Sequence, residues 1–242
     1  MTTFDLAVFA VAVISGATAA VTGFGIGSLL TPLLSLQLGT GVAVAAVSLP
    51  HAAATIVRCW RLRASIDWGV LKRFGILSAA GGLGGALLYA QLGGRALTLA
   101  LASLLMLTSS AGLTGWSRKW HPHGPLVWAL GLLSGFFGGI AGNQGSLRSA
   151  ALSAFRLSPL AFVATATATG VLVDGARMPV YLWTGGAALR PIAPTIVVAI
   201  VGVLIGTFAG ERALRAMPAR VFRLVVNVTI GALGVWLAWR AW

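Results

Sequence analysis

Two glycine-rich segments of the sequence contain residues that can bind a small anion. The first holds Gly23, Gly25, Gly27 and Ser28, and Pro32 follows it. Repeated glycine lowers helix propensity and proline lacks a backbone N–H group, so we expect a non-helical break here rather than one continuous helix. A helix that begins at such a break directs free N–H groups and a positive dipole end toward it, and both favour an anion.

The second segment adds polar groups to the same pattern. Its candidate ligands are Gly142, Asn143, Gln144, Gly145 and Ser146. Arg148 follows in an apolar neighbourhood where an unpaired guanidinium group is costly, so it is predicted to supply the main positive charge for the anion. Helix packing also produces glycine-rich segments, and it is the preferred explanation for two other clusters, the glycines of residues 81–85 and those of residues 202–210.

Four further polar residues within apolar segments are candidate site residues: His51, Thr165, Asp174 and Arg177. For His51 an interfacial histidine and a proton-coupled site both stay open. Thr165 is a candidate ligand, although a threonine hydroxyl more often bonds back to its own helix. Asp174 and Arg177 are three residues apart, which predicts an ion pair on one helix face. Arg177 is also a candidate ligand, and Asp174 and His51 are the candidates for proton coupling.

Enzyme chemistry is not expected from this sequence. Cys59 is the single cysteine, so neither a disulfide nor a cysteine pair for a metal is available, and we expect no metal or other cofactor. The chain contains no phosphate-binding loop of the GxxxxGKS/T type, which argues against direct use of ATP. It also lacks a clustered nucleophile and base.

Membrane-spanning helices must position these residues. Of the 242 residues 58% are hydrophobic and only 9% charged, whereas soluble domains carry about 25% charged residues. Residues 74–89, 96–113 and 194–209 contain no charged side chain, and each can cross a hydrocarbon core of about 30 Å as a helix. We therefore predict an all-α membrane protein of about eight transmembrane helices.

The net charge of +13 would suggest nucleic acid as a partner of a soluble protein. Here the basic residues gather between apolar segments, which is typical of cytoplasmic loops that face anionic lipid. Membrane lipid is therefore the expected partner rather than nucleic acid, and a homo-oligomer stays open.

The two glycine-rich segments divide the chain into two transmembrane repeats, residues 1–114 and 126–242, joined by a polar linker at residues 115–125. Three basic clusters, at residues 58–73, 118–119 and 212–223, share the cytoplasmic side if each half crosses the membrane an odd number of times. Arg95, Arg177, Arg190 and Arg240 are then outside. This assignment favours inverted repeats, with both termini on the far side and with the two breaks facing each other near the membrane middle.

The motifs GFGIGSLLTPLL, GFFGGIAGNQGSLRSAAL and ATATATGVLVDGARMPVYL resemble the sulfite exporter TauE/SafE family of membrane permeases over nearly the whole chain. The resemblance implies export of sulfite, of a sulfonate such as sulfoacetate, or of a related small oxoanion across the bacterial plasma membrane. The resemblance also implies that the site residues lie in the two breaks and in the helices just after them. The chain departs from members with lysine or asparagine in those helices, because it has His51 and Thr169 there.

These observations predict a secondary transporter that binds a small oxoanion between the repeats and alternates access by moving one repeat against the other. A passive anion channel is the alternative, because few titratable residues lie within the apolar segments. Transport that accumulates the anion against its gradient would distinguish the two.

Overall fold

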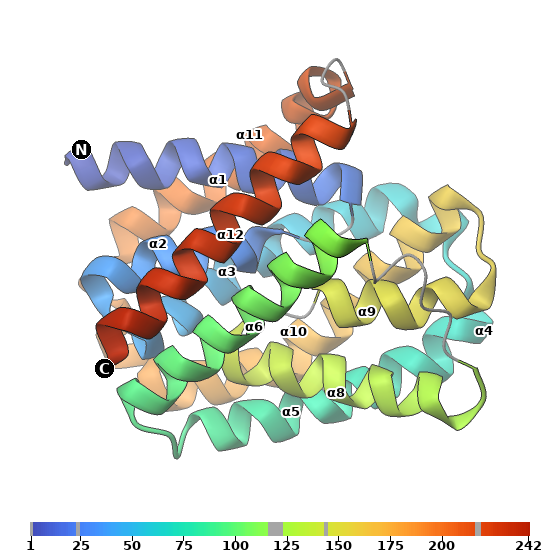
Figure 1. Cartoon of the computed structure of the whole chain (residues 1–242), viewed down its shortest axis with the longest axis horizontal. Coiled ribbons are helices and arrows are strands. Elements are labelled where there is room, and N and C mark those ends of the chain that lie inside the picture. Colours follow the sequence, from blue (N-terminus) through green and yellow to red (C-terminus); the bar gives the residue numbers. More distant parts are fainter. Residues whose placement is uncertain (1, 23–24, 116–122, 143–144, 216–218) are drawn as a thin grey trace.

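The computed structural model describes residues 2–22, 25–115, 123–142, 145–215 and 219–242, which form helices and short connections (Figure 1). The first part of the chain forms α1 (Thr3–Thr22), α2 (Ile26–Leu38), α3 (Thr40–Leu62), α4 (Trp68–Val70), α5 (Ile76–Tyr89) and α6 (Gly94–Thr114). The second part forms α8 (Pro125–Ala141), α9 (Gly145–Leu152), α10 (Pro159–Leu189), α11 (Ala193–Arg215) and α12 (Ala219–Ala241). The helical fold class is therefore as predicted.

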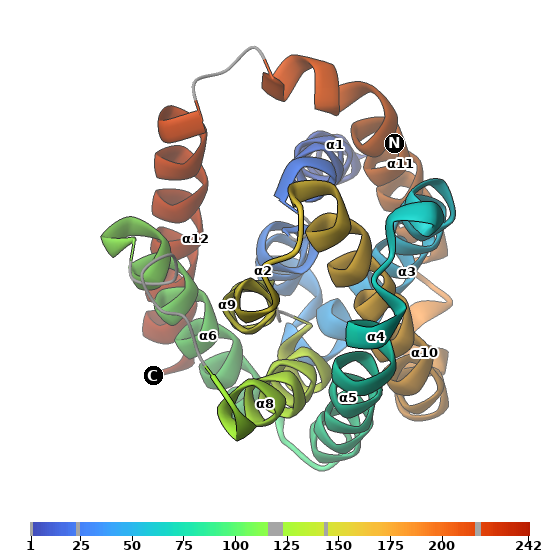
Figure 2. The same ribbon diagram turned by 90° about the vertical axis from the view of Figure 1, so that its right-hand side faces the viewer.

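Most of the helices run along one common direction, and the short helices α2 and α9 lie between the others. The end-on view in Figure 2 shows α2 and α9 in the middle, with the longer helices around them. Both short helices begin just after a glycine-rich segment. Gly25 and Gly142, described residues of these two segments, are both buried.

Glycines let pairs of helices approach until their backbones touch. On α5, a Cβ atom added at Gly81 or Gly85 would overlap a backbone carbonyl of α8, and one at Gly82 would press on Val173 of α10. On α11, a Cβ atom at Gly206 would overlap a backbone carbonyl of α1. The predicted packing role of these two glycine clusters is confirmed at these positions. The surroundings of Gly210 lie outside what the structure describes.

The outer surface is apolar, as expected for contact with lipid. Leu107, Trp183 and Trp239 are 67%, 91% and 75% exposed, which would be unfavourable for so large an apolar surface in water. Within the described residues, four helices are long and apolar enough to span a membrane: Thr3–Ala20, Thr40–Ser65, Gly94–Thr114 and Pro159–Leu189. Shorter apolar helices cover Ile26–Leu38, Pro125–Ala141 and Ala193–Ala209.

The first break is shorter than the sequence suggested. Helix α2 begins at Ile26 directly after Gly25, whose φ of 132° is open to glycine but strained for other residues. Gly27 and Ser28 are therefore helical, and the prediction that they lie in an unwound segment is wrong. Gly25 thus lies directly before the start of α2, and Pro32 is accommodated inside this helix. Gly23 lies outside the described residues.

The second break has the same form. Helix α8 ends at Ala141, and Gly142 adopts the left-handed conformation with φ of 71°. Gly145 and Ser146 already belong to α9, so the prediction that they lie in an unwound segment is also wrong. Asn143 and Gln144 lie outside the described residues.

Candidate functional site

Helices α3 and α10 pack together with polar faces between them. His51, Thr55 and Arg58 lie four and three residues apart along α3, a spacing that places them on one face. All three are buried, with exposed fractions of 7%, 2% and 4%. Asp174 and Arg177 share a face of α10 in the same way and are also buried. The two faces form a cluster of charged and polar side chains inside an otherwise apolar protein.

The Asp174 carboxylate is the centre of this cluster. Its Oδ2 atom lies 2.6 Å from His51 Nδ1 and accepts a hydrogen bond of 3.1 Å from the Thr55 hydroxyl. Its Oδ1 atom accepts a hydrogen bond of 3.0 Å from Arg177 Nε and lies 2.8 Å from Arg177 Nη2. The ion pair predicted between Asp174 and Arg177 is confirmed, and the contact with His51 connects residues 123 positions apart in the sequence.

Arg177 and Tyr181 connect α10 to the end of α8. Arg177 Nη1 donates a hydrogen bond to the Gly138 carbonyl, and the Tyr181 hydroxyl donates one to the Gly139 carbonyl. These carbonyls belong to the last turn of α8, where a positive charge is favourable, and the Gly138 carbonyl also accepts a hydrogen bond of 2.9 Å from the Gly142 N–H group. Arg177 thus lies in the protein core, and its expected place outside the membrane is wrong.

Arg148 extends from α9 into the same region. Its Nη1 atom donates a hydrogen bond of 3.1 Å to the Ala166 carbonyl of α10. The side chain is 4% exposed, and its Nε and Nη2 atoms have no hydrogen-bond partner among the described residues. The guanidinium group therefore has donors left for a ligand.

Arg58 lies within α3 and is only 4% exposed. The prediction that it belongs to a cytoplasmic basic cluster at residues 58–73 is therefore wrong for this residue. Its Nε and Nη1 atoms also lack a partner within the described part of the chain. The helical spacing from His51 was the signal that could have placed it in the site.

The second break touches the helix that follows the first break. A Cβ atom at Gly142 would lie 3.6 Å from the Thr31 hydroxyl of α2 and 3.8 Å from Arg177 Nη1. The Thr31 hydroxyl is buried and has no partner among the residues described. Gly25 lies against Thr18 of α1 instead. The second break thus reaches the charged cluster, whereas Gly25 contacts the preceding helix.

The predicted site residues therefore fall into separate groups. The structure brings His51, Arg148, Asp174 and Arg177 into one buried region. Thr165 is on the same helix, but its hydroxyl accepts a hydrogen bond of 3.0 Å from the Asp67 backbone N–H group and so belongs to a loop contact. Thr55, Arg58 and Tyr181 were not among the predicted site residues.

The charges of the cluster suit an anion rather than a metal ion. Three guanidinium groups face one carboxylate, and no group of three or more histidine, cysteine, aspartate or glutamate side chains occurs in the described ranges. Metal ions such as Zn²⁺ and Mg²⁺ need several such ligands. Arginine instead offers a planar fork of N–H donors that fits oxoanions.

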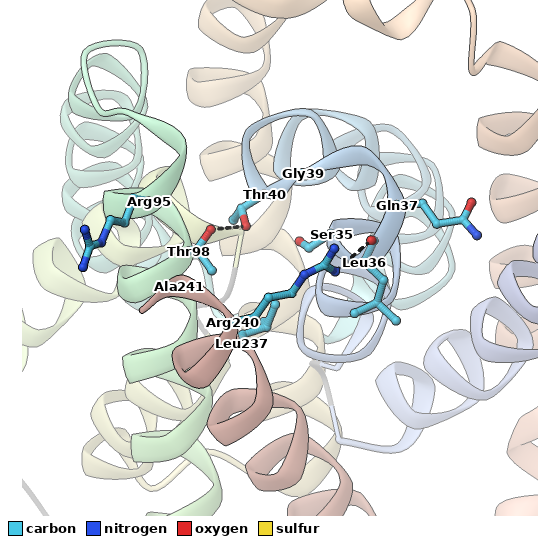
Figure 3. Close-up of a pocket in the computed structure, with 10 residues that line it drawn as sticks. All are labelled: Ser35, Leu36, Gln37, Gly39, Thr40, Arg95, Thr98, Leu237, Arg240 and Ala241. Atoms are coloured by element: carbon cyan, nitrogen blue, oxygen red, sulfur yellow. Dashed lines mark hydrogen bonds between the residues drawn. The ribbon is translucent and has the colours of Figure 1, made fainter.

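A separate surface pocket of about 380 Å³ lies between the ends of α2, α3, α6 and α12 (Figure 3). Arg240 lines it and donates a hydrogen bond of 3.0 Å to the Leu36 carbonyl, while the Thr40 and Thr98 hydroxyls lie 2.7 Å apart. Arg95 lines it too. The pocket contains none of the predicted site residues, and its two arginines are exposed.

The family model described as Sulfite exporter TauE/SafE matches residues 8–237 of the chain. No curated protein and no solved structure matches it.

Proposed function

Since the chain belongs to the sulfite exporter TauE/SafE family, whose members are membrane transporters and not enzymes, we propose that it is a secondary transporter of the bacterial inner membrane. Its cargo is a small oxoanion, such as sulfite or a sulfonate, which it exports by alternating access. The observation that carries this proposal is the buried Arg148 guanidinium group, whose Nε and Nη2 atoms have no partner among the described residues.

The energetic argument rests on the cost of burying a charge without partners. A buried donor that loses its hydrogen bond costs about 1–3 kcal/mol, and more when it is charged. An oxoanion beside Arg148 would satisfy these donors with charge-assisted hydrogen bonds. The position of Arg148 on α9, near the second break, also allows backbone N–H groups of that segment to contribute.

We assign proton coupling to the pair of His51 and Asp174. Their side chains are in contact at 2.6 Å, buried, and close to Arg148: a Cβ atom at Gly170 would lie 3.1 Å from Arg148 Nη1 and 4.0 Å from His51 Cε1. A change of protonation on this pair would therefore change the charge next to the proposed anion site. Arg58, Arg177 and Arg148 are the other charged groups that face the pair.

We further propose that residues 1–114 and 126–242 are inverted repeats. Each half then makes an odd number of passes, because the short helices α2 and α9 add one pass to the four longer helices of each half, which are α1, α3, α5 and α6 and then α8, α10, α11 and α12. In these repeats α1 corresponds to α8, and α5 corresponds to α11. The packing supports this correspondence, because α1 packs on α11 and α5 packs on α8, so the two pairs are equivalent. In Figure 1, α1 runs from the left-hand end of the bundle, whereas α8 runs toward that end.

The test is transport by purified protein in liposomes. We expect uptake or efflux of sulfite, and accumulation against its gradient when a pH gradient is imposed. Arg148→Ala should weaken anion affinity by about tenfold or more, and Arg148→Lys should recover part of this loss. Arg156→Ala is the matched control, because Arg156 follows α9 but is exposed. Equilibration without accumulation would identify a passive channel, and unchanged affinity in Arg148→Ala would overturn the assignment of Arg148.

A further inference from the structure

Two buried arginines on different helices have donors without partners. Arg58 on α3 leaves Nε and Nη1 unpaired among the described residues, and Arg148 on α9 leaves Nε and Nη2 unpaired. Each side chain is only 4% exposed. Each unpaired atom is itself fully buried, so bulk water does not satisfy these donors.

The described charges near them do not balance. Asp174 is the one buried carboxylate in the described part of the chain, and Arg177 occupies its Oδ1 atom through Nε and Nη2. The Oδ2 atom is in contact with His51 and Thr55. Arg177 and Asp174 thus neutralise each other, and Arg58 and Arg148 remain as two positive charges.

The two arginines lie around the same crossing of α3 and α10. A Cβ atom at Gly170 would lie 3.1 Å from Arg148 Nη1 and 3.5 Å from Thr55 Cγ2, so Arg148 of α9 and Thr55 of α3 both border this glycine. Arg58 follows Thr55 by one turn on the same face of α3. Arg58 is also among the charges that act on Arg148. A small ligand near Gly170 can therefore be reached from both helices.

We propose that Arg58 and Arg148 together bind one doubly charged oxoanion, so that the site selects dianions such as sulfate or the fully deprotonated form of sulfite over singly charged sulfonates. This inference rests on the proposed function and adds Arg58 as its specificity-determining residue. A dianion neutralises both free guanidinium groups, whereas a monoanion leaves one buried positive charge without a counter-charge. A pyramidal or tetrahedral oxoanion also has enough oxygen atoms to accept from two forks at once.

The first part of the test compares two probes on the wild-type protein. Sulfate and methanesulfonate both present sulfur-bound oxygen atoms, but sulfate carries two negative charges and methanesulfonate carries one. Binding is measured by isothermal titration calorimetry on purified full-length protein in detergent, at one ionic strength. We expect sulfate to bind about tenfold more tightly or better. Equal affinity for the two probes would overturn the charge selectivity while leaving the proposed function intact, and binding of neither probe nor sulfite would overturn the proposed function itself.

The second part uses variants of Arg58. Arg58→Gln should lower sulfate affinity by about tenfold, change methanesulfonate affinity much less, and so remove most of the preference. Arg61→Gln makes the same charge change one turn later at an exposed position, and it should keep the preference. Arg58→Lys retains the charge and should keep part of the preference for sulfate, and it can be measured even if Arg58→Gln fails to fold. An unchanged preference in a folded Arg58 variant would overturn the role of Arg58.

Discussion

At the scale of single residues, Asp174 is the carboxylate on which three side chains from two helices converge. We expect Asp174→Asn to lower the free energy of unfolding by about 3–5 kcal/mol, because it leaves the buried Arg177 without its counter-charge. Thermal or denaturant unfolding in detergent measures this. Asp67→Asn is the matched control: Asp67 accepts from the Val70 N–H group at the start of α4, and asparagine caps a helix equally well. Similar stability losses in the two variants would contradict the role given to Asp174.

Tyr181 and Tyr89 make similar hydrogen bonds at different places, so a comparison of their phenylalanine variants separates the effect of losing a hydrogen bond from the effect of its position. Tyr181 and Tyr89 have ring centroids 4.7 Å apart, and each hydroxyl donates to a backbone carbonyl, that of Gly139 or that of Gly41. Replacing either with phenylalanine should cost about 0.5–1.5 kcal/mol of stability. Only Tyr181→Phe should also slow anion transport in liposomes, because it loosens the end of α8 next to the second break. Equal transport by the two variants would argue against this connection.

The charged cluster was only partly predictable from the sequence. The ion pair of Asp174 and Arg177 follows from their spacing on one helix. The contact between His51 and Asp174 does not, because it depends on how α3 meets α10, and no local pattern specifies that crossing. Arg58 begins a run of basic residues typical of a cytoplasmic loop, whereas its spacing from His51 places it on the inner face of α3.

At the scale of helices, glycines on α5 differ in what they face. Gly81 meets a backbone carbonyl of α8, whereas the nearest atom to a Cβ at Gly84 is a ring carbon of Phe136 at 3.9 Å. We therefore expect Gly81→Ala to force the two helices apart and to reduce the yield of folded protein. Gly84→Ala should be neutral or slightly stabilising, since alanine favours helix. Size-exclusion profiles and unfolding in detergent compare the two, and equal behaviour would show that the interface tolerates a methyl group.

The helices themselves could be located in the sequence from their apolar composition and glycine breaks, but their exact ends could not. Gly25 and Gly142 have positive φ, but Gly27 and Gly145 are helical, so α2 and α9 begin within the glycine-rich motifs rather than after them. Pro32 also removes only one backbone donor, and α2 continues through it.

At the scale of the whole molecule, the start of α1 and the end of α12 lie at the same end of the bundle, at the left in Figure 1, while α4 lies at the opposite end. We expect the α4 end to face the cytoplasm, because it carries Lys72 and Arg73. With Cys59 replaced by alanine, a cysteine at position 72 should react with an impermeant maleimide only in inverted vesicles. Cysteines at positions 2 and 242 should react only in intact cells. Labelling of all three from one side would exclude this orientation.

The packing of α1 on α11 and of α5 on α8 determines which parts of the protein can move as rigid bodies. Each interface joins a helix of residues 1–114 to a helix of residues 126–242, with glycine-mediated backbone contact. A motion that separated the two halves would have to open both interfaces, and close-packed interfaces of this kind resist gradual opening. In the proposed transport cycle we therefore expect each moving part to combine helices from both halves, instead of one repeat moving against the other, so that the boundary between the moving parts does not follow the order of the chain.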